Sequence, residues 1–134
     1  MKIILFYEKP GCVTNTKQKA MLRRAGCMVI ERNLLDHGMN QDELLAFLKP
    51  LHVSQWFNPN APKIKDGTIN PNRISEAAAI KLLMLEPLLI RRPLIVALGR
   101  KLCGFDANKL ESILQVRFES YSSEACSSPD SACQ

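Results

Sequence analysis

The chain has 134 residues, of which 46% are hydrophobic, and its formal net charge at pH 7 is +5. This length suits one domain with a moderate core, and no apolar segment reaches the roughly 18 residues that a membrane span needs. The first residues lack the small-residue cleavage site of a secretory signal. We therefore expect a globular cytoplasmic protein that does not cross a membrane.

The charge is unevenly distributed along the chain. Residues 119–134 carry three acidic side chains and no basic one, so the remainder is more basic than the whole. A basic body attracts anions, and the candidates are an oxyanion, a glutathione carboxylate, an acidic protein or nucleic acid. Nucleic acid is the least favoured, because the basic residues are spread out and are not interleaved with aromatic ones. A solvated basic surface without a partner is the alternative.

The first quarter of the chain predicts a strand, a helix and a second strand. Residues 2–7 contain the unbroken apolar run Ile3-Ile4-Leu5-Phe6 and predict a strand buried on both faces. Residues 14–25 predict a helix closed by Gly26, and residues 28–31 predict the second strand. The short connections imply a right-handed crossover between two parallel strands.

The middle of the chain predicts two helices separated by irregular sequence. Asn40 and Glu43 have the spacing of a capping box, and the helix that they begin stops at Pro50. Ser75 caps the second helix, which is rich in alanine and leucine. Residues 53–72 between them predict an irregular loop with one short helical turn, in which Trp56 and Phe57 are apolar anchors.

The last third predicts a β-hairpin and a final helix. Residues 94–97 and 101–103 form the hairpin, and Asp106 caps the helix. The predicted order is β-α-β, a helical insertion, a β-hairpin and a helix, which is that of an α/β thioredoxin-like fold. We assign residues 1–118 to this domain and residues 119–134, rich in serine, to a disordered tail.

Cys12 is the candidate reactive residue. It follows a Pro-Gly turn and directly precedes the first predicted helix, where the partial positive charge favours a thiolate. Lys9, Lys17 and Lys19 are expected to act in the same direction. Asn15 stands where a second cysteine would complete a C-x-x-C motif, so Cys12 would act as a single thiol. The turn predicts an accessible sulfur, and a small buried cysteine is the alternative.

Arg92 and Pro93 immediately precede the third predicted strand. By analogy with the thioredoxin fold, we expect a cis peptide bond here, which would place the Arg92 guanidinium beside Cys12. A guanidinium stabilises a thiolate and binds an oxyanion through two parallel hydrogen bonds. Solvated charges at Arg91 and Arg92 are the alternative. The other groups predicted to contact an oxyanion or thiol ligand belong to Val13, Thr14, Asn15, Thr16 and Pro93.

Four short motifs occur in a fixed order: Tyr7-Glu8-Lys9-Pro10-Gly11-Cys12, Trp56-Phe57-Asn58, Leu88-Leu89-Ile90-Arg91-Arg92-Pro93-Leu94 and Cys103-Gly104-Phe105-Asp106. Together they resemble the arsenate reductase (ArsC) and Spx-like family, and within it the nitrogenase-associated proteins. The resemblance covers residues 1–118. It implies that Cys12 corresponds to the arsenate-attacking cysteine of glutathione- and glutaredoxin-coupled reductases. It also implies that Arg92 corresponds to one of their oxyanion-binding arginines.

The chain departs from the pattern of these reductases at two positions. Two further arginines that the resemblance implies are missing, one within residues 56–59 and one at Gly104. Each hydrogen bond to a charged group is worth about 1.5–3 kcal/mol, so efficient arsenate reduction is not expected. The basic residues that would partly replace the missing arginines are Lys63, Lys65, Arg91 and Lys101.

The five cysteines are scattered and lack the spacing of a zinc site, so we expect neither a bound metal nor a bound cofactor. Cys126 and Cys133 in the tail would resolve an oxidised form of Cys12, pair with each other, or belong to an unconstrained terminus. Our first hypothesis is a thiol-dependent oxidoreductase that uses glutathione or glutaredoxin. The second is a non-catalytic interaction or regulatory protein with an acidic protein partner, linked to nitrogen fixation as the resemblance suggests.

Overall fold

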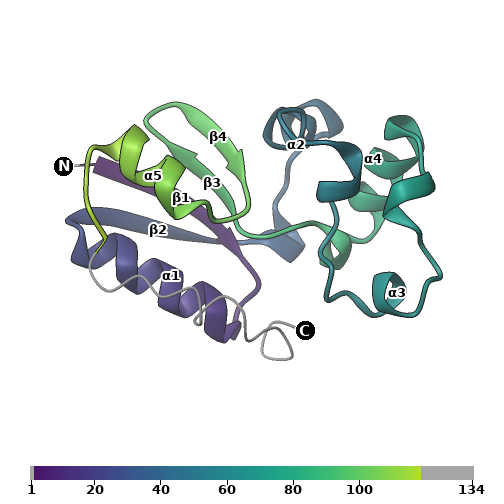
Figure 1. The fold of residues 1–134 in the computed structure, drawn as a ribbon, viewed down its shortest axis with the longest axis horizontal. Helices are drawn as coiled ribbons and strands as arrows, with labels where there is room; N and C mark the ends of the chain where they lie inside the picture. Colours follow the sequence, from purple (N-terminus) through teal and green to yellow (C-terminus); the bar gives the residue numbers. More distant parts are fainter. Residues whose placement is uncertain (1, 119–134) are drawn as a thin grey trace.

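The structure is a computed structural model that describes residues 2–118 (Figure 1). Its sheet has the strand order β2-β1-β3-β4. The strands are β1 (Lys2–Glu8), β2 (Cys27–Asn33), β3 (Leu94–Ala97) and β4 (Arg100–Cys103). β1 runs parallel to β2 and antiparallel to β3, and β3 and β4 form a hairpin. The predicted parallel crossover and antiparallel hairpin are therefore confirmed, whereas the predicted tail lies outside the described residues.

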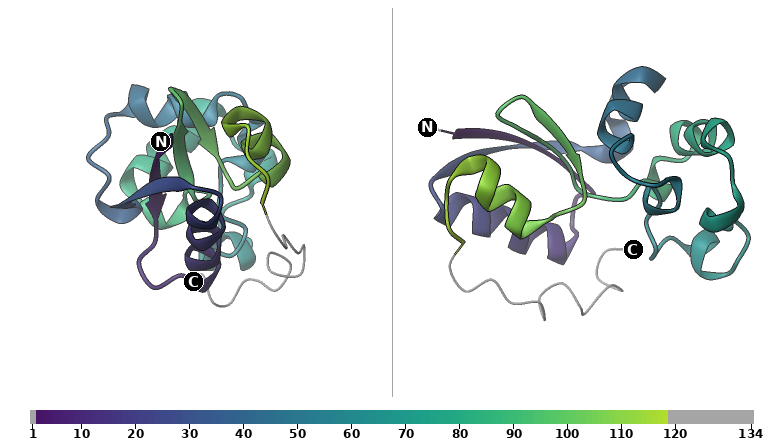
Figure 2. Two further views of the ribbon diagram at one scale, coloured as in Figure 1. Left: turned by 90° about the vertical axis from the view of Figure 1, so that its left-hand side faces the viewer. Right: turned by 45° about the horizontal axis from the view of Figure 1, so that its top comes forward.

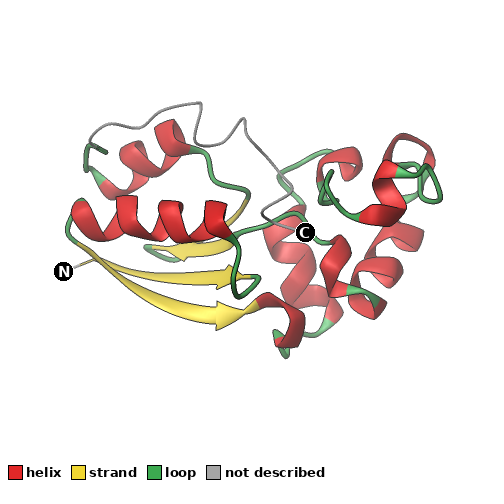
Figure 3. Ribbon diagram, turned by 90° about the horizontal axis from the view of Figure 1, so that it is seen from below, coloured by secondary structure: helices red, strands yellow, loops and turns green. Residues whose placement is uncertain are grey.

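One face of the sheet is covered by two helices, α1 (Val13–Arg24) and α5 (Ala107–Leu114). Figure 3 shows both helices on the same side of the strands. Their apolar side chains pack with those of β1 into one buried cluster, because alternate residues of a strand point to the same face. The predicted cap is confirmed, since Asp106 Oδ1 accepts a hydrogen bond from the backbone N–H of Lys109 at 3.1 Å.

The opposite face of the sheet is covered at one end, so the prediction that β1 is buried on both faces is wrong. Ile3 is 52% exposed and Met28 on the neighbouring strand is 47% exposed. Further along β1, Tyr7 meets the ring of Phe47 edge-on, with the ring centroids 6.0 Å apart. Phe47 belongs to α2 (Gln41–Leu48), which reaches over only the carboxyl end of β1.

The helical insertion lies beyond the carboxyl ends of β1 and β2 (Figures 1 and 2). It contains α2, α3 (Pro62–Lys65) and α4 (Glu76–Leu85). The capping box of Asn40 and Glu43 and the Ser75 cap are both confirmed. The segment 53–72 contains more helix than the one turn predicted. Four 3-10 turns complete the described elements: Leu34–Asp36, Val53–Gln55, Pro71–Arg73 and Pro87–Leu89.

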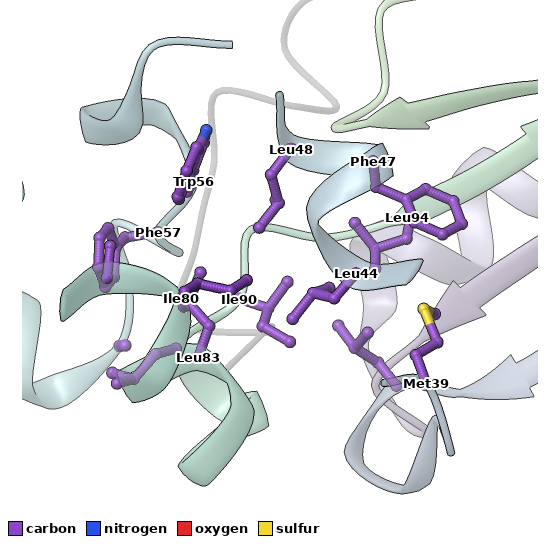
Figure 4. Packing of buried hydrophobic residues seen from close by; sticks show 14 residues of the cluster. Met39, Leu44, Phe47, Leu48, Trp56, Phe57, Ile80, Leu83, Ile90 and Leu94 are labelled. Carbon is purple, nitrogen blue, oxygen red and sulfur yellow. The ribbon is translucent and has the colours of Figure 1, made fainter. Parts of the chain in front are cut away.

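A second apolar cluster holds the insertion together (Figure 4). Trp56 is fully buried and Phe57 is 2% exposed, which confirms both as core anchors. The indole N–H of Trp56 donates to the Leu51 carbonyl at 3.0 Å, so its one polar group is satisfied. Among the described helices, none is both long and apolar enough to cross a membrane.

Candidate anion and thiol site

Cys12 is the N-cap residue of α1. Its Sγ accepts a hydrogen bond from the backbone N–H of Asn15 at 3.5 Å. Its carbonyl accepts from the backbone N–H of Thr16 and from the Thr16 hydroxyl, both at 3.0 Å. The sulfur thus occupies the position that a capping oxygen normally takes, where the helix N-terminus favours negative charge.

The sulfur of Cys12 is not accessible as the sequence predicted, because Cys12 is only 1% exposed. The preceding turn is exposed at Pro10 and Gly11, but the cysteine side chain folds back onto the first turn of α1. Its neighbour Val13 is 50% exposed. An exposed turn therefore does not by itself expose the sulfur that follows it.

Lys19 does not support a thiolate in the way expected from the sequence. Its ammonium donates to Glu31 and lies 2.8 Å from Glu8 Oε1. Burial lowers the pKa of Lys19, but the hydrogen bonds and charges of Glu31 and Glu8 outweigh it, and the net shift is upward. The positive charge of Lys19 is therefore neutralised within the fold.

The first turn of α1 presents a pair of amides next to Cys12. Asn15 is 2% exposed, and its Nδ2 donates to Gln18 Oε1 at 3.0 Å. The backbone N–H groups of Asn15 and Thr16 are directed at Cys12 itself. Of the four α1 residues predicted to contact a ligand, Thr14 and Asn15 line a surface hollow, described below, whereas Val13 and Thr16 do not.

The Arg92–Pro93 peptide bond is cis, as expected from the fold analogy. The terminal nitrogens Nη1 and Nη2 of Arg92 are buried and have no hydrogen-bond partner among the described residues. Burial lowers the pKa of this guanidinium from its ordinary value. Arginine nonetheless stays charged in proteins, so within residues 2–118 two buried nitrogens of this cation have no hydrogen-bond partner. Such a group is costly unless an anion joins it.

Backbone hydrogen bonds join residues 56–58 to residues 89–91, the segment that precedes Arg92 and Pro93. Phe57 and Ile90 form an antiparallel bridge. On its two sides, the Asn58 N–H donates to the Leu89 carbonyl at 2.7 Å, and the Arg91 N–H donates to the Trp56 carbonyl at 2.9 Å. This short ladder carries the residues after Phe57 to the same place as the two arginines.

These segments enclose a surface hollow of about 210 Å³. It lies between the first turn of α1, the loop after Phe57 and the Arg91-Arg92 pair. Among the described residues, the lining contains two guanidiniums and no carboxylate. Its described members are Thr14, Asn15, Gln18, Asn58, Pro59, Asn60, Arg91, Arg92, Gly104 and Phe105.

The sequence interpretation placed Thr14, Asn15 and Arg92 in the site but missed several amides. Gln18 lies three residues after Asn15, which puts both on one face of α1, so helical spacing would have found it. Asn58 and Asn60 gave no such signal, because their place depends on the bridge between Phe57 and Ile90.

The other two cysteines of the described part, Cys27 and Cys103, both have a raised pKa. Burial raises the pKa of Cys103 to about 12 against the lowering effect of Arg91, and its Sγ donates to the Arg91 carbonyl at 3.5 Å. Burial likewise raises the pKa of Cys27. Cys126 and Cys133, predicted as resolving thiols, lie outside the described residues. Within residues 2–118, no cluster of three or more His, Cys, Asp or Glu side chains is arranged to hold a metal.

Comparisons with known proteins relate the whole described domain to one family. A family model described as the ArsC family matches residues 7–113. An uncharacterized 15.7 kDa protein in the draG 3′ region of Rhodospirillum rubrum is 40% identical over 106 residues, which are 79% of this chain and 74% of that protein. The global transcriptional regulator Spx 2 of Bacillus cereus is 25% identical over 114 residues, covering 84% of this chain and 87% of the regulator.

Solved structures agree with this relationship. An ArsC family related protein from Bacteroides fragilis has a TM-score of 0.71 and 27% identity, covering 82% of this chain and 96% of its own. Arsenate reductase from Vibrio cholerae has a TM-score of 0.65 and 20% identity, covering 86% and 98%. At 20% identity, the similarity to the Vibrio cholerae protein concerns the fold alone. The predicted thioredoxin-like fold is confirmed by both.

Proposed function

Because the chain belongs to the ArsC family, we propose that it is a thiol-dependent redox or oxyanion-binding protein in which Cys12 reacts and Arg92 binds the anion. The observation that carries this proposal is the Arg92 guanidinium, whose terminal nitrogens are buried without a partner. An anion that enters the hollow would remove the free-energy cost of leaving these nitrogens buried without a partner, and would thereby stabilise the folded protein.

Arg92 and Cys12 are linked through the first turn of α1. Asn15 lines the hollow together with Arg92, and its N–H donates to the Cys12 sulfur. An anion at Arg92 would therefore stand beside the first turn of α1, where the sulfur is held. Helix N-termini favour both a thiolate and a bound anion.

The proposed redox step uses glutathione disulfide and follows thiol–disulfide exchange. The Cys12 thiolate attacks one sulfur of the disulfide, so a Cys12–glutathione bond forms and one glutathione leaves as a thiolate. A second glutathione thiolate, or a glutaredoxin thiolate, then attacks the glutathione sulfur and releases the Cys12 thiolate. Because Cys12 is 1% exposed, the sulfur must be uncovered locally before attack. A reducing compartment such as the cytoplasm would supply glutathione.

The test is residue-resolved mass spectrometry after incubation of the reduced protein with glutathione disulfide, and again after glutaredoxin and glutathione are added. We expect an adduct on Cys12 that glutaredoxin removes. Cys12→Ser should lose the adduct, whereas Cys27→Ser, which alters a buried thiol elsewhere in the sheet, should keep it. If the reduced wild-type protein forms no Cys12 adduct, the redox proposal fails.

A second candidate function is a non-catalytic interaction protein on the same fold, linked to nitrogen fixation and binding an acidic partner. Burial of Cys12 favours it, because a sulfur that is 1% exposed is poorly placed for turnover. Co-purification from cells grown with and without fixed nitrogen, followed by reconstitution with the purified partner, tests it. Binding that persists in Cys12→Ser supports this role, whereas binding that requires Cys12 supports the thiol chemistry.

A further inference from the structure

We propose that the open face of the sheet is a docking site for an acidic amphipathic helix of a partner protein. The open face is the side of the strands opposite α1 and α5, at the end that α2 does not reach (Figure 3). This inference does not involve the thiol chemistry of Cys12. It deepens the second candidate function, on which it rests, by naming the surface and the kind of partner.

The strand register gathers apolar side chains on this face. Ile3 of β1 pairs with Met28 of β2. Leu5 pairs with Ile30 of β2 and with Val96 of β3. These five residues alternate along the strands with those that pack under α1 and α5, so they lie on the opposite face. The result is an apolar patch that crosses three strands. A contiguous exposed patch of this kind, bordered by polar residues, is typical of an interaction site.

Leu98 extends the patch into the turn between β3 and β4. Because Ala97 pairs with Ile4, Leu98 continues beside Ile3 at the same end of the sheet. The turn consists of Leu98 and Gly99, with φ values of 49° and 76°. Such a turn favours asparagine before glycine, and a leucine with positive φ costs free energy. Leu98 is 56% exposed, so little burial within the chain offsets that cost. Burial under a partner would offset it.

The charged residues on the open face are basic. Arg32 of β2 and Lys101 of β4 lie there, because they alternate with side chains directed at the helices. Both are exposed, and no ion pair among the described residues involves either. The described strands contain two acidic residues, Glu8 and Glu31, and Lys19 of α1 binds both on the covered face. The strands therefore present positive charge and no carboxylate on the open face.

These features favour an acidic helix over the other possible occupants. A second copy of the chain, docked face to face, would bring Arg32 and Lys101 against the same basic residues, which is unfavourable. Helices pack on the faces of sheets, as α1 and α5 do on the opposite side. An amphipathic helix would bury the patch under its apolar stripe. Glutamate or aspartate beside that stripe would then meet the two basic side chains.

The experiment is an NMR titration of the full-length protein with two synthetic peptides of about 18 residues, long enough to form a helix. Both peptides carry the same leucine stripe, and they differ only in having glutamate or lysine beside it. The variants are Met28→Ser, Arg32→Gln and Leu98→Asn. Leu85→Ser and Arg100→Gln are the matched controls. Leu85 is 78% exposed at the end of α4, and Arg100 pairs with a residue that faces the helices.

The glutamate peptide should shift the amide signals of the open face and leave those of α5 unchanged. Met28→Ser and Arg32→Gln should each weaken its binding about fivefold or more, since each removes apolar or charged contact. The two controls should stay within about twofold of wild type. Leu98→Asn should weaken binding while raising the melting temperature, because asparagine suits the turn.

The inference is overturned if the glutamate peptide leaves the open-face signals unchanged, or if the two peptides bind equally well. It is also overturned if these signals shift with protein concentration alone, because a second copy would then be the occupant. A co-purified partner that binds Met28→Ser and Arg32→Gln as tightly as wild type would overturn this inference and leave the second candidate function standing.

Discussion

The Lys19 ammonium lies 2.8 Å from a carboxylate oxygen of Glu8, and the two side chains are only 10% and 11% exposed. Glu31 accepts from the same ammonium. Lys19 comes from α1, Glu8 from β1 and Glu31 from β2. The two interactions of Lys19 therefore anchor the helix that begins after Cys12 to two strands. Lys19 therefore acts as a structural cation within the fold.

Replacing Lys19 by methionine should destabilise the protein strongly. Glu8 would keep its buried charge without a partner, and breaking a buried pair in this way typically costs about 3–5 kcal/mol. Urea unfolding followed by circular dichroism measures the change. Lys17→Met on the exposed side of the same helix is the control and should change the unfolding free energy little. Equal effects of the two substitutions would contradict this role for Lys19.

The same cluster predicts how stability depends on pH. The hydrogen bond from Lys19 is the largest cause that lowers the pKa of Glu31 below its ordinary value of 4.5. A lowered pKa in the folded state stabilises the protein above pH 4.5, and this contribution is lost as the pH falls through the folded value. Glu31→Gln should therefore be less stable than wild type at pH 6–7, by about 1 kcal/mol or less for this half-exposed group. The gap should close as the pH falls below 4.5 and through the lowered pKa of Glu31 in the folded state; a gap that stays constant with pH would refute the prediction.

Arg92→Met should make the protein more stable while removing its anion affinity. Its buried nitrogens have no partner, and an unsatisfied buried group costs about 1–3 kcal/mol. Thermal unfolding with and without sulfate measures both effects. Sulfate should raise the melting temperature of wild type but not that of Arg92→Met, because a ligand stabilises only the state that binds it. A variant that is less stable than wild type in the absence of sulfate would argue for an essential structural contact of Arg92.

Cys103 and Cys27 should resist alkylation in the folded protein. Burial raises the pKa of both thiols, that of Cys103 to about 12, so their thiolate fractions at pH 8 are small. Iodoacetamide treatment followed by peptide mass spectrometry measures labelling of each cysteine, and the same reaction in urea gives the unprotected rate. Labelling of Cys103 in the native protein as fast as in urea would show that its burial does not persist in solution.

The helix caps and the hairpin could be predicted because their signals are local. Asn40 with Glu43, Ser75 and Asp106 each act within one helical turn, and the structure has all three caps. The exposure of Ile3 could not be predicted in the same way. An unbroken apolar run gives no periodic signal of how much of each face of the strand is covered. It therefore cannot show that one face of β1 is covered by α2 only near its carboxyl end.

In the candidate site too, the features that could be predicted are those with a local signal in the sequence. The position of Cys12 as a helix cap and the place of Arg92 before Pro93 follow from neighbouring residues and from the family resemblance. The ion pairs of Lys19 depend on contacts between separate elements, and the exposed turn before Cys12 gives no signal that this cysteine is buried. Asn58 reaches the hollow through a bridge between residues 57 and 90, a pairing for which the sequence carries no local signal.

The ionisation of Cys12 tests the central claim most directly. Alkylation of the reduced protein across a pH series, resolved for Cys12 by mass spectrometry, gives its pKa in wild type and in Arg92→Gln. The account predicts a wild-type pKa below the ordinary value of about 8.5, and a higher pKa in the variant. A Cys12 pKa at or above the ordinary value, unchanged by Arg92→Gln, would contradict the proposed stabilisation of a Cys12 thiolate by the helix N-terminus and Arg92.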